Sequence, residues 1–286
     1  MSGQPARVLE IISGFSTQYP LGGIENYVME LCQAFDQSLV APTVVGMWNY
    51  GSEVEAQWIA ALNAKGIATI SGVQWNAEQP YQSFWKSFKK LEHDLQGQSF
   101  DIIHSHTQFG DVAALLLKQR IHAKALVRTI HNEYEWKKKP LRRVLLTSLL
   151  LPLFFDLEIG ISQAVADKLN RRLVSRLFRR DSISIHNAID LKKFEKIDAD
   201  REAVLLRLGL DHPRGPVIGT VGRMVEQKGL TYLVRAVPLV SQQFPEAVFI
   251  IVGSGELEAS LRAQSAQLGV EDHVLFTGHR LDVPEI

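Results

Sequence analysis

The strongest constraint on the fold is a regular alternation of short apolar runs with helical patterns along almost the whole chain. Residues 8–12 and 43–47 form compact, largely apolar runs, and a helical pattern at residues 23–35 lies between them. Such strands are typical of parallel sheets that are buried on both faces, and right-handed crossovers connect them. The alternation therefore predicts an α/β protein whose parallel sheets are doubly wound.

The alternation falls into two series of unequal length. Residues 1–188 contain seven predicted strands and form a first Rossmann-like lobe, whereas residues 201–286 contain three. The polar stretch at residues 189–200 is typical of a hinge or linker. A doubly wound sheet binds its ligand between its first and fourth strands, so the second series holds only the first half of such a lobe. We therefore expect an incomplete second lobe, in a chain that is truncated or ends early.

Composition excludes several classes of protein. Apolar residues make up 46% of the 286 residues and charged residues 22%, which is typical of a globular protein rather than a disordered one. Lys and Arg number 31, as do Asp and Glu, so no overall basic field attracts nucleic acid. The single cysteine, Cys32, has no internal partner, and the N-terminus lacks the apolar core of a signal peptide. We expect a cytoplasmic protein that does not bind nucleic acid.

The most informative segment follows the predicted strand at residues 217–221. Two glycines, Gly222 and Gly229, bracket Arg223 and Lys228 at the start of a helical pattern. Glycine lets backbone N–H groups approach a ligand, a helix N-terminus carries a positive dipole, and the two cations add fixed charge. The segment has neither the Walker nor the dinucleotide-binding spacing of glycines. It predicts a diphosphate site, with an ordinary turn that carries two surface cations as the alternative.

Two further glycine-rich turns precede predicted helices. Gly22 and Gly23 begin a helix in the first lobe, and Gly253 and Gly255 do so in the second. Such turns offer backbone N–H groups to an anion. A plain tight turn is the alternative in both places.

Three histidines lie at the ends of predicted strands in the first lobe. His104 and His106 alternate along one strand and therefore share a face, and His131 ends the next strand. Open α/β sheets bind their ligands at this carboxyl edge. No third ligand at a recognisable spacing accompanies the pair, so no metal site is predicted. A structural role is the alternative for each histidine.

In this order, the segments resemble the retaining glycosyltransferases of family 4, which have the two-lobed GT-B fold. The resemblance spans nearly the whole chain. In such enzymes a sugar nucleotide binds mainly to the second lobe, the acceptor binds to the first, and the reaction occurs between them. The segments that carry the resemblance are residues 22–25, 103–106, 129–132, 160–162, 185–190, 222–229 and 251–255.

The resemblance implies a role for each candidate residue. Arg223 and Lys228 would bind the donor diphosphate and stabilise charge on the leaving nucleotide, so that neither a metal nor a cofactor is needed. His106 would orient the transferred sugar, and Glu25 and His131 would face the acceptor. The other donor-side residues would be Gly22, Gly23, Gly253, Gly255, His279 and Arg280.

The implied reaction is the transfer of a hexose, with retention, from a UDP- or GDP-sugar to a hydroxyl of a glycan or of a lipid-linked acceptor. Two features depart from the family pattern. Ala188 stands where glycine is usual, and the chain ends before the Glu-x7-Glu segment that holds the ribose and the donor sugar. The alternatives are a noncatalytic remnant whose first lobe binds a glycan or a protein partner, and a nucleotide-sugar epimerase on the same fold.

A basic and apolar stretch at residues 137–180 lies outside most of these motifs. It contains eleven Lys and Arg against three acids, although the whole chain is neutral. Its apolar part, residues 144–155, contains Pro152 and is shorter than the roughly 20 residues that span a bilayer. Two interpretations remain open: a buried crossover helix beside a solvated basic turn, and a face that rests on anionic lipid at the inner side of the membrane.

Overall fold

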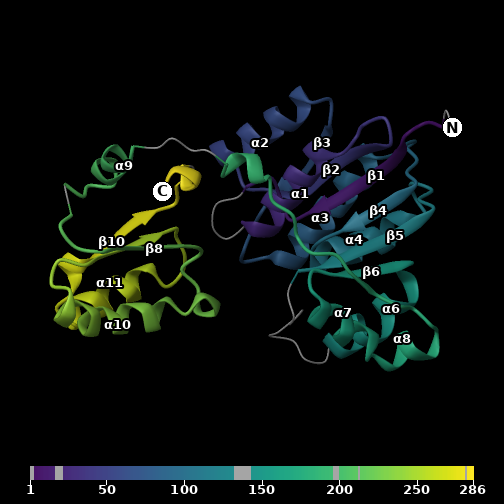
Figure 1. Ribbon diagram of the computed structural model, residues 1–286. Coiled ribbons are helices and arrows are strands. Elements are labelled where there is room, and N and C mark those ends of the chain that lie inside the picture. The colour runs from purple at the N-terminus through teal and green to yellow at the C-terminus, as the bar shows by residue number, and fades with distance from the viewer. Residues whose placement is uncertain (1–2, 17–21, 132–142, 196–199, 212, 281) are drawn as a thin grey trace. The chain divides into compact units, whose positions relative to one another are not determined.

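The computed structural model describes residues 3–16, 22–131, 143–195, 200–211, 213–280 and 282–286. The chain divides into two compact units, one that ends at Ile189 and one that begins at Asp190. Each unit is a parallel β-sheet with helices packed on it (Figure 1). The predicted class, an α/β protein with parallel sheets, is confirmed.

The sheet of the first unit has seven parallel strands in the order β3-β2-β1-β4-β5-β6-β7. The direction in which strands are added reverses between β1 and β4, so the carboxyl ends of these two strands form the ligand-binding edge expected of a doubly wound sheet. The strands are β1 (Ala6–Ile12), β2 (Val40–Asn49), β3 (Ala68–Gln74), β4 (Ile102–Ser105), β5 (Ala125–Ile130), β6 (Leu157–Gly160) and β7 (Ile183–Ser184).

Two apolar clusters hold helices on opposite faces of this sheet. Leu9 and Ile11 of β1 pack with α3 and α4, whereas Ile12 packs with α1 and α2. Cys32 lies in the second cluster, and burial raises the pKa of its thiol well above the usual value, so the thiol is structural. The helices of this unit are α1 (Gly23–Ala34), α2 (Glu53–Ala64), α3 (Pro80–Asp94), α4 (Gln108–Lys118), α6 (Leu151–Phe154), α7 (Gln163–Asn170) and α8 (Leu173–Leu177).

Two helices differ from their predicted extent. The helix expected over residues 164–178 is split into α7 and α8 at Arg172, whose backbone is extended and whose guanidinium donates to the buried Glu158 over 2.9 and 3.1 Å. The described part of the helix expected over residues 141–155 is a π-helical segment, η1 (Arg143–Leu150), followed by α6. Pro152 in α6 has no N–H to continue a regular α-helical ladder.

The sheet of the second unit has three parallel strands in the order β10-β9-β8, and β8 lies at an edge of this described sheet. An apolar cluster that includes Met224, Val234 and Ile251 packs helices on one face, and Ile250 and Val252 belong to a cluster with α9. The elements are α9 (Arg201–Arg207), β8 (Val217–Val221), α10 (Leu230–Gln243), β9 (Val248–Val252), α11 (Glu258–Gln267) and β10 (Val274–Gly278).

Candidate functional site

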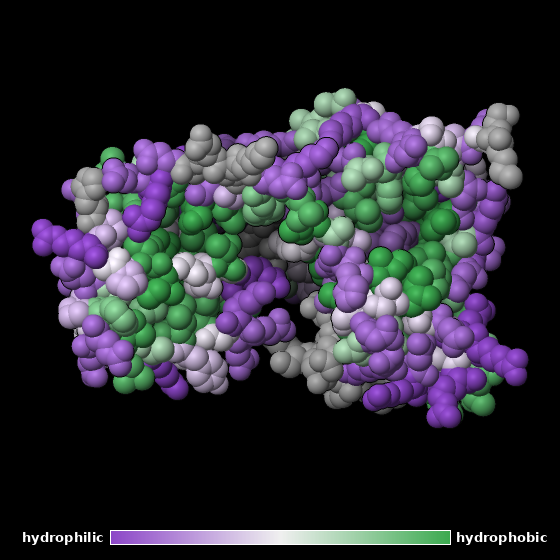
Figure 2. Space-filling view, in the orientation of Figure 1, coloured by the Kyte–Doolittle hydropathy of each residue, from purple (hydrophilic) through white to green (hydrophobic). Residues whose placement is uncertain are grey.

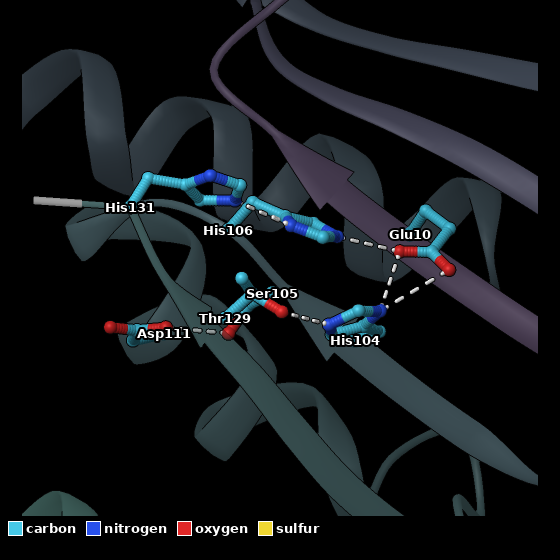
Figure 3. Close-up of polar contacts among 7 residues, drawn as sticks. All are labelled: Glu10, His104, Ser105, His106, Asp111, Thr129 and His131. Atoms are coloured by element: carbon cyan, nitrogen blue, oxygen red, sulfur yellow. Dashed lines mark hydrogen bonds and ion pairs between the residues drawn. The ribbon is translucent and has the colours of Figure 1, made fainter. Parts of the chain in front are cut away.

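A cluster of buried polar side chains lies where β1, β4 and β5 end (Figure 3). Glu10 of β1 is only 1% exposed, and its carboxylate accepts hydrogen bonds from Nδ1 of His104, at 3.3 Å, and from Nε2 of His106, at 2.8 Å. The sheet register causes this meeting, because Glu10 pairs with His104 across β1 and β4. His106 stands two residues further along and shares the face of His104.

The cluster continues onto β5 through both histidines. Nε2 of His104 lies 2.8 Å from the hydroxyl of Thr129, and Nδ1 of His106 lies 3.1 Å from Nε2 of His131. Both ring nitrogens of His106 are therefore engaged within this unit. The sequence predicted that His104 and His106 share a face, but it did not predict Glu10 as their common partner.

The opposite face of the same strands carries a second polar network. Arg128 of β5 is buried and pairs with Asp111 of α4 at 3.1 Å and with Glu158 of β6 at 3.5 Å. Ser105 donates to Asp111 over 2.5 Å. This network fastens α4 to the strands whose ends carry the histidines.

Burial and the cluster itself set the protonation of these groups. Burial raises the pKa of Glu10, but the charge and hydrogen bonds of His104 and His106 outweigh it and lower the pKa to about 2. Burial lowers the pKa of His106 to about 4, helped by the charge of His104, although Glu10 opposes the shift. Burial also lowers the pKa of His131 to about 3, with smaller contributions from His106 and His104. At neutral pH Glu10 is ionised, and His106 and His131 are neutral.

Glu10, His104 and His106 also place one potential metal-ligand atom each within 4.8 Å of one another. The spacing of the histidines on β4 could not reveal this third group, because Glu10 lies on β1, 94 residues earlier than His104 in the sequence. The three groups already satisfy one another by hydrogen bonds. We interpret them as a hydrogen-bonded cluster, and the expected independence from metal stays a prediction.

A pocket of about 230 Å³ opens at this edge of the first unit. His106 and His131 form part of its wall, and Ile24, Trp48 and Phe109 add apolar surface. Trp48 meets the ring of Phe109 edge-on at 5.2 Å between centroids. The pocket thus combines aromatic surface with a few polar groups, as small-molecule sites do.

Two of the residues predicted to contact substrate, Gly22 and Glu25, are hydrogen-bonded to each other at the start of α1. Glu25 is buried, and its carboxylate accepts a hydrogen bond from the backbone N–H of Gly22 over 3.0 Å. A glutamate at this position of the first turn commonly closes a helix N-terminus in this way. The N–H that we expected to reach the donor phosphates is therefore bound to Glu25. Contacts of Gly22, Gly23 and Glu25 with substrate stay predictions.

In the second unit, the turns that follow β8 and β9 lie against each other. The N–H of Gly222 donates to the carbonyl of Val252 over 2.9 Å, and the N–H of Met224 donates to the carbonyl of Ser254 over 3.0 Å. A Cβ on Gly253, whose φ is +133°, would lie 2.1 Å from the carbonyl oxygen of Gly222, and a Cβ on Gly255 would lie 2.5 Å from that of Met224. Both glycines are required by this close approach.

The predicted cations of the second unit differ in their surroundings. Arg223 and Lys228 are exposed on the turn after β8, and the stem of Lys228 runs beside Gly222. After β10, His279 is exposed, whereas Arg280 donates two hydrogen bonds of 2.7 Å to Asp282. The pair with Arg280 lowers the pKa of Asp282. Arg280 is thus held by a carboxylate, and its predicted role near the nucleotide stays a prediction.

Residues 21–193 match the sequence profile of Glycosyltransferase Family 4, and residues 215–286 match that of Glycosyl transferases group 1. The chain belongs to glycosyltransferase family 4. These matches confirm the resemblance that the motifs of the sequence suggest. Among the described residues, no helix is long and apolar enough to cross a membrane.

Two relatives illustrate the range of the family. The GDP-mannose-dependent alpha-(1-6)-phosphatidylinositol monomannoside mannosyltransferase of Mycolicibacterium smegmatis is 25% identical over 90% of this chain and 63% of its own length. The 2-deoxystreptamine glucosyltransferase of Streptomyces kanamyceticus is 35% identical over 33% of this chain and 24% of its own length. The chain thus spans less than two thirds of the length of these relatives.

Solved structures confirm the GT-B-like fold of this family 4 chain. The Anabaena protein HepE, crystallised with UDP and glucose, superposes with a TM-score of 0.74 over 97% of this chain and 70% of its own. The two sequences are 19% identical, so this likeness concerns the fold.

We expect acid to destabilise the first unit between about pH 6.5 and pH 4. His106 and His131 have pKa values of about 4 and 3 in the folded chain, whereas a free imidazole has a value of 6.5. Below pH 6.5 the unfolded state therefore binds more protons, and the free energy of unfolding falls as pH falls. Urea denaturation across this range measures the slope. His131→Asn should reduce the slope, and His93→Asn, an exposed control, should leave it unchanged; equal slopes in all three proteins would contradict the assignment.

Gly253→Ala should destabilise the second unit by roughly 1–3 kcal/mol, because the added Cβ overpacks a backbone contact that cannot yield easily. Gly219→Ala is the matched control, since a Cβ there meets no atom within 4 Å. Chemical denaturation followed by circular dichroism compares the two variants. Equal stabilities of both variants would show that the two turns are not in close contact.

Proposed function

We propose that this protein transfers a hexose from a nucleotide-diphosphate sugar to an acceptor hydroxyl, with retention of configuration. The observation that carries the proposal is the exposed pair Arg223 and Lys228 on the turn after β8, at the carboxyl end of a parallel sheet. Fixed cations at such an edge suit a diphosphate and stabilise the charge that develops on it as the sugar leaves. With two cations available, the transfer has no need of a metal ion.

The contact between the two turns of the second unit supports this assignment. Backbone hydrogen bonds from Gly222 and Met224 hold the cation-bearing turn against Gly253 and Gly255. The turn is therefore set in place before a ligand arrives, and preorganised charges cost little reorganisation during a reaction. Its glycine-rich surface also leaves room for phosphate oxygens to approach the backbone.

For the donor we propose a UDP- or GDP-sugar. HepE was crystallised with UDP and glucose, and the Mycolicibacterium relative is named for its dependence on GDP-mannose. Both nucleotides present the same diphosphate to Arg223 and Lys228. The base would lie beyond that diphosphate, and His279 and Arg280 after β10 are our candidates for its neighbours.

For the acceptor we propose a hydroxyl of a glycan or of a lipid-linked sugar, bound at the pocket of the first unit. The pocket offers the aromatic surface of Trp48 and Phe109 beside His131. The name of the Mycolicibacterium relative, which acts on a phosphatidylinositol mannoside, supports a lipid-linked acceptor. His106, whose ring lines the pocket while both of its nitrogens are engaged, would touch the transferred sugar and help orient it, and Glu25 would shape the acceptor side from the start of α1.

An exposed apolar and basic surface on the first unit supports our proposal of a lipid-linked acceptor. Apolar side chains and arginines are exposed on α6, on α8 and on the residues directly after α8. The lower right of Figure 2, where these helices lie, is largely hydrophilic, with a few hydrophobic residues among the polar ones. Leu151 and Pro152 are buried, whereas the rest of α6 is exposed. One side of α6 therefore packs inward, in agreement with the interpretation of this stretch as a buried crossover helix. We propose that the outer side rests on anionic lipid at the inner face of the membrane. The exposed residues are Leu153, Phe154, Leu173, Arg176, Leu177, Phe178, Arg179 and Arg180; the basic residues 137–142 lie outside the described part of the chain.

Calorimetry with UDP-glucose and GDP-mannose tests the donor site. We expect Arg223→Ala and Lys228→Ala each to weaken binding by roughly 10- to 100-fold, because each removes a charged hydrogen-bond donor worth about 1.5–3 kcal/mol. Arg235→Ala, an exposed arginine on α10, is the control and should bind as the parent does. Equal affinity in all variants would contradict the site. Binding without transfer to any glycan acceptor would favour a noncatalytic role.

Co-sedimentation with vesicles tests the lipid surface. We expect binding to vesicles that contain phosphatidylserine, and none to purely zwitterionic vesicles. Arg176→Glu with Arg179→Glu should weaken binding roughly thirtyfold or more, since each cation near an anionic surface contributes about 1 kcal/mol. The control pair Lys86→Glu and Lys89→Glu lies on α3 and should have little effect. Binding to neither kind of vesicle would end the proposal.

A further inference from the structure

A line of hydrogen bonds runs from the interior of the first unit to the edge of its sheet (Figure 3). It begins at Glu10, passes through His106 and ends at His131, with steps of 2.8 and 3.1 Å. Its first bond has a fixed direction. An ionised carboxylate only accepts hydrogen bonds, so the proton between Glu10 and His106 belongs to Nε2 of His106.

The direction of the first bond determines that of the second. A neutral imidazole carries a proton on one nitrogen and a lone pair on the other. Because His106 is protonated on Nε2, its Nδ1 is an acceptor, and Nε2 of His131 must donate to it. The same rule leaves Nδ1 of His131 unprotonated. The buried charge of Glu10 thus fixes the tautomer of a histidine that it does not touch.

Two residues that line the pocket each carry a polar atom with no hydrogen-bond partner in the described part of the chain. Nδ1 of His131 is buried and has no hydrogen-bond partner among the residues that the structure describes, and the same is true of Nε1 of Trp48. Both residues line the pocket. One atom is an acceptor and the other a donor, and each costs roughly 1–3 kcal/mol while it is unpaired. A group that both donates and accepts would satisfy the pair.

We propose that Glu10 is a positioning residue, which acts through His106 to present Nδ1 of His131 as the hydrogen-bond acceptor for a hydroxyl of the bound acceptor sugar. A neighbouring hydroxyl of the same ring would accept from Nε1 of Trp48. The inference rests on the proposed function for the identity of the sugar, but the tautomer itself follows from the cluster alone. The two histidines of the pocket therefore have different roles. Both ring nitrogens of His106 are engaged, whereas Nδ1 of His131 can accept a hydrogen bond from a ligand.

In this arrangement His131 orients the hydroxyl and does not remove its proton. With a pKa of about 3, His131 is a weak base that would return the proton at once. In the reaction itself this O–H would turn away from Nδ1, and its proton would pass to the leaving phosphate as the new glycosidic bond forms and the bond between sugar and phosphate breaks. The lone pair on Nδ1 directs the O–H bond, and hence the attacking oxygen lone pair, before that step.

Nitrogen NMR of the chain labelled with ¹⁵N-histidine, recorded with a chelator and without substrate, reads the tautomers directly. We expect His106 and His131 both to carry their proton on Nε2 at neutral pH, with Nδ1 of each at the chemical shift of an unprotonated nitrogen. A proton on Nδ1 of His131, or on both of its nitrogens, would overturn the proposal. This experiment does not depend on donor binding or on transfer, so its failure is distinct from failure of the proposed function.

Glu10→Gln tests whether the carboxylate sets the tautomers. A glutamine both donates and accepts, so we expect the Nδ1 and Nε2 resonances of His106 and His131 to move toward the averaged values of mixed tautomers. Glu55→Gln is the matched control, because Glu55 is similarly buried and, among the described residues, accepts backbone N–H bonds from Phe15, Tyr50 and Gly51. Unchanged histidine resonances in folded Glu10→Gln would refute the positioning role. If that variant does not fold, the spectrum of the unaltered chain decides.

A titration with simple sugars tests the proposed hydrogen bond between a sugar hydroxyl and Nδ1 of His131. The probes are the methyl α-glycosides of glucose, galactose, mannose and N-acetylglucosamine, added to the labelled chain. We expect at least one to shift the Nδ1 resonance of His131 in the direction of an accepted hydrogen bond, and Trp48→Phe to weaken that response. No change at His131 with any of the four, or a response at His104 instead, would overturn this part of the proposal.

Discussion

The first unit depends on an ionised carboxylate held in the middle of its sheet. Glu10 is almost fully buried, and a buried charge is costly unless polar partners compensate for it. Here the imidazoles of His104, on β4, and of His106, directly after β4, do so. A shift of one residue between β1 and β4 would turn both histidines to the other face of the sheet and leave the carboxylate alone. The buried charge therefore favours the observed register, and this register brings His106 to His131 at the pocket.

Much of this fold could be predicted from the sequence, because buried parallel strands and amphipathic helices have different periods. The shared face of His104 and His106 follows from the two-residue period of a strand. The sequence pattern does not single out Glu10, because the run at residues 8–12 is otherwise apolar. The signal was present, since a single carboxylate in the centre of a short apolar strand needs a partner. That its partners lie on β4 depends on sheet order, which local pattern does not encode.

Other differences between the predicted and the observed structure involve side chains that bind the backbone or a residue on a distant strand. Arg172, at which the predicted helix is interrupted, donates hydrogen bonds to Glu158, which is buried on β6. Gly22 stands at the predicted helix start, but its N–H is taken by Glu25. Gly253 and Gly255 were singled out as candidate ligand contacts, and the structure adds a steric reason for them, since no side chain fits between the two turns. A motif can identify the right glycine while its physical reason lies elsewhere.

The contact between these turns has a consequence for how the protein can diverge. The path of the turn that carries Arg223 and Lys228 is set by main-chain hydrogen bonds and by the missing side chains of two glycines on its neighbour. Most side chains on this turn can therefore be exchanged without altering its course. New ligand preferences are then accessible through single substitutions, with no insertion or deletion to remodel the loop, and lineages that share this scaffold can drift apart in specificity while their backbones stay superimposable.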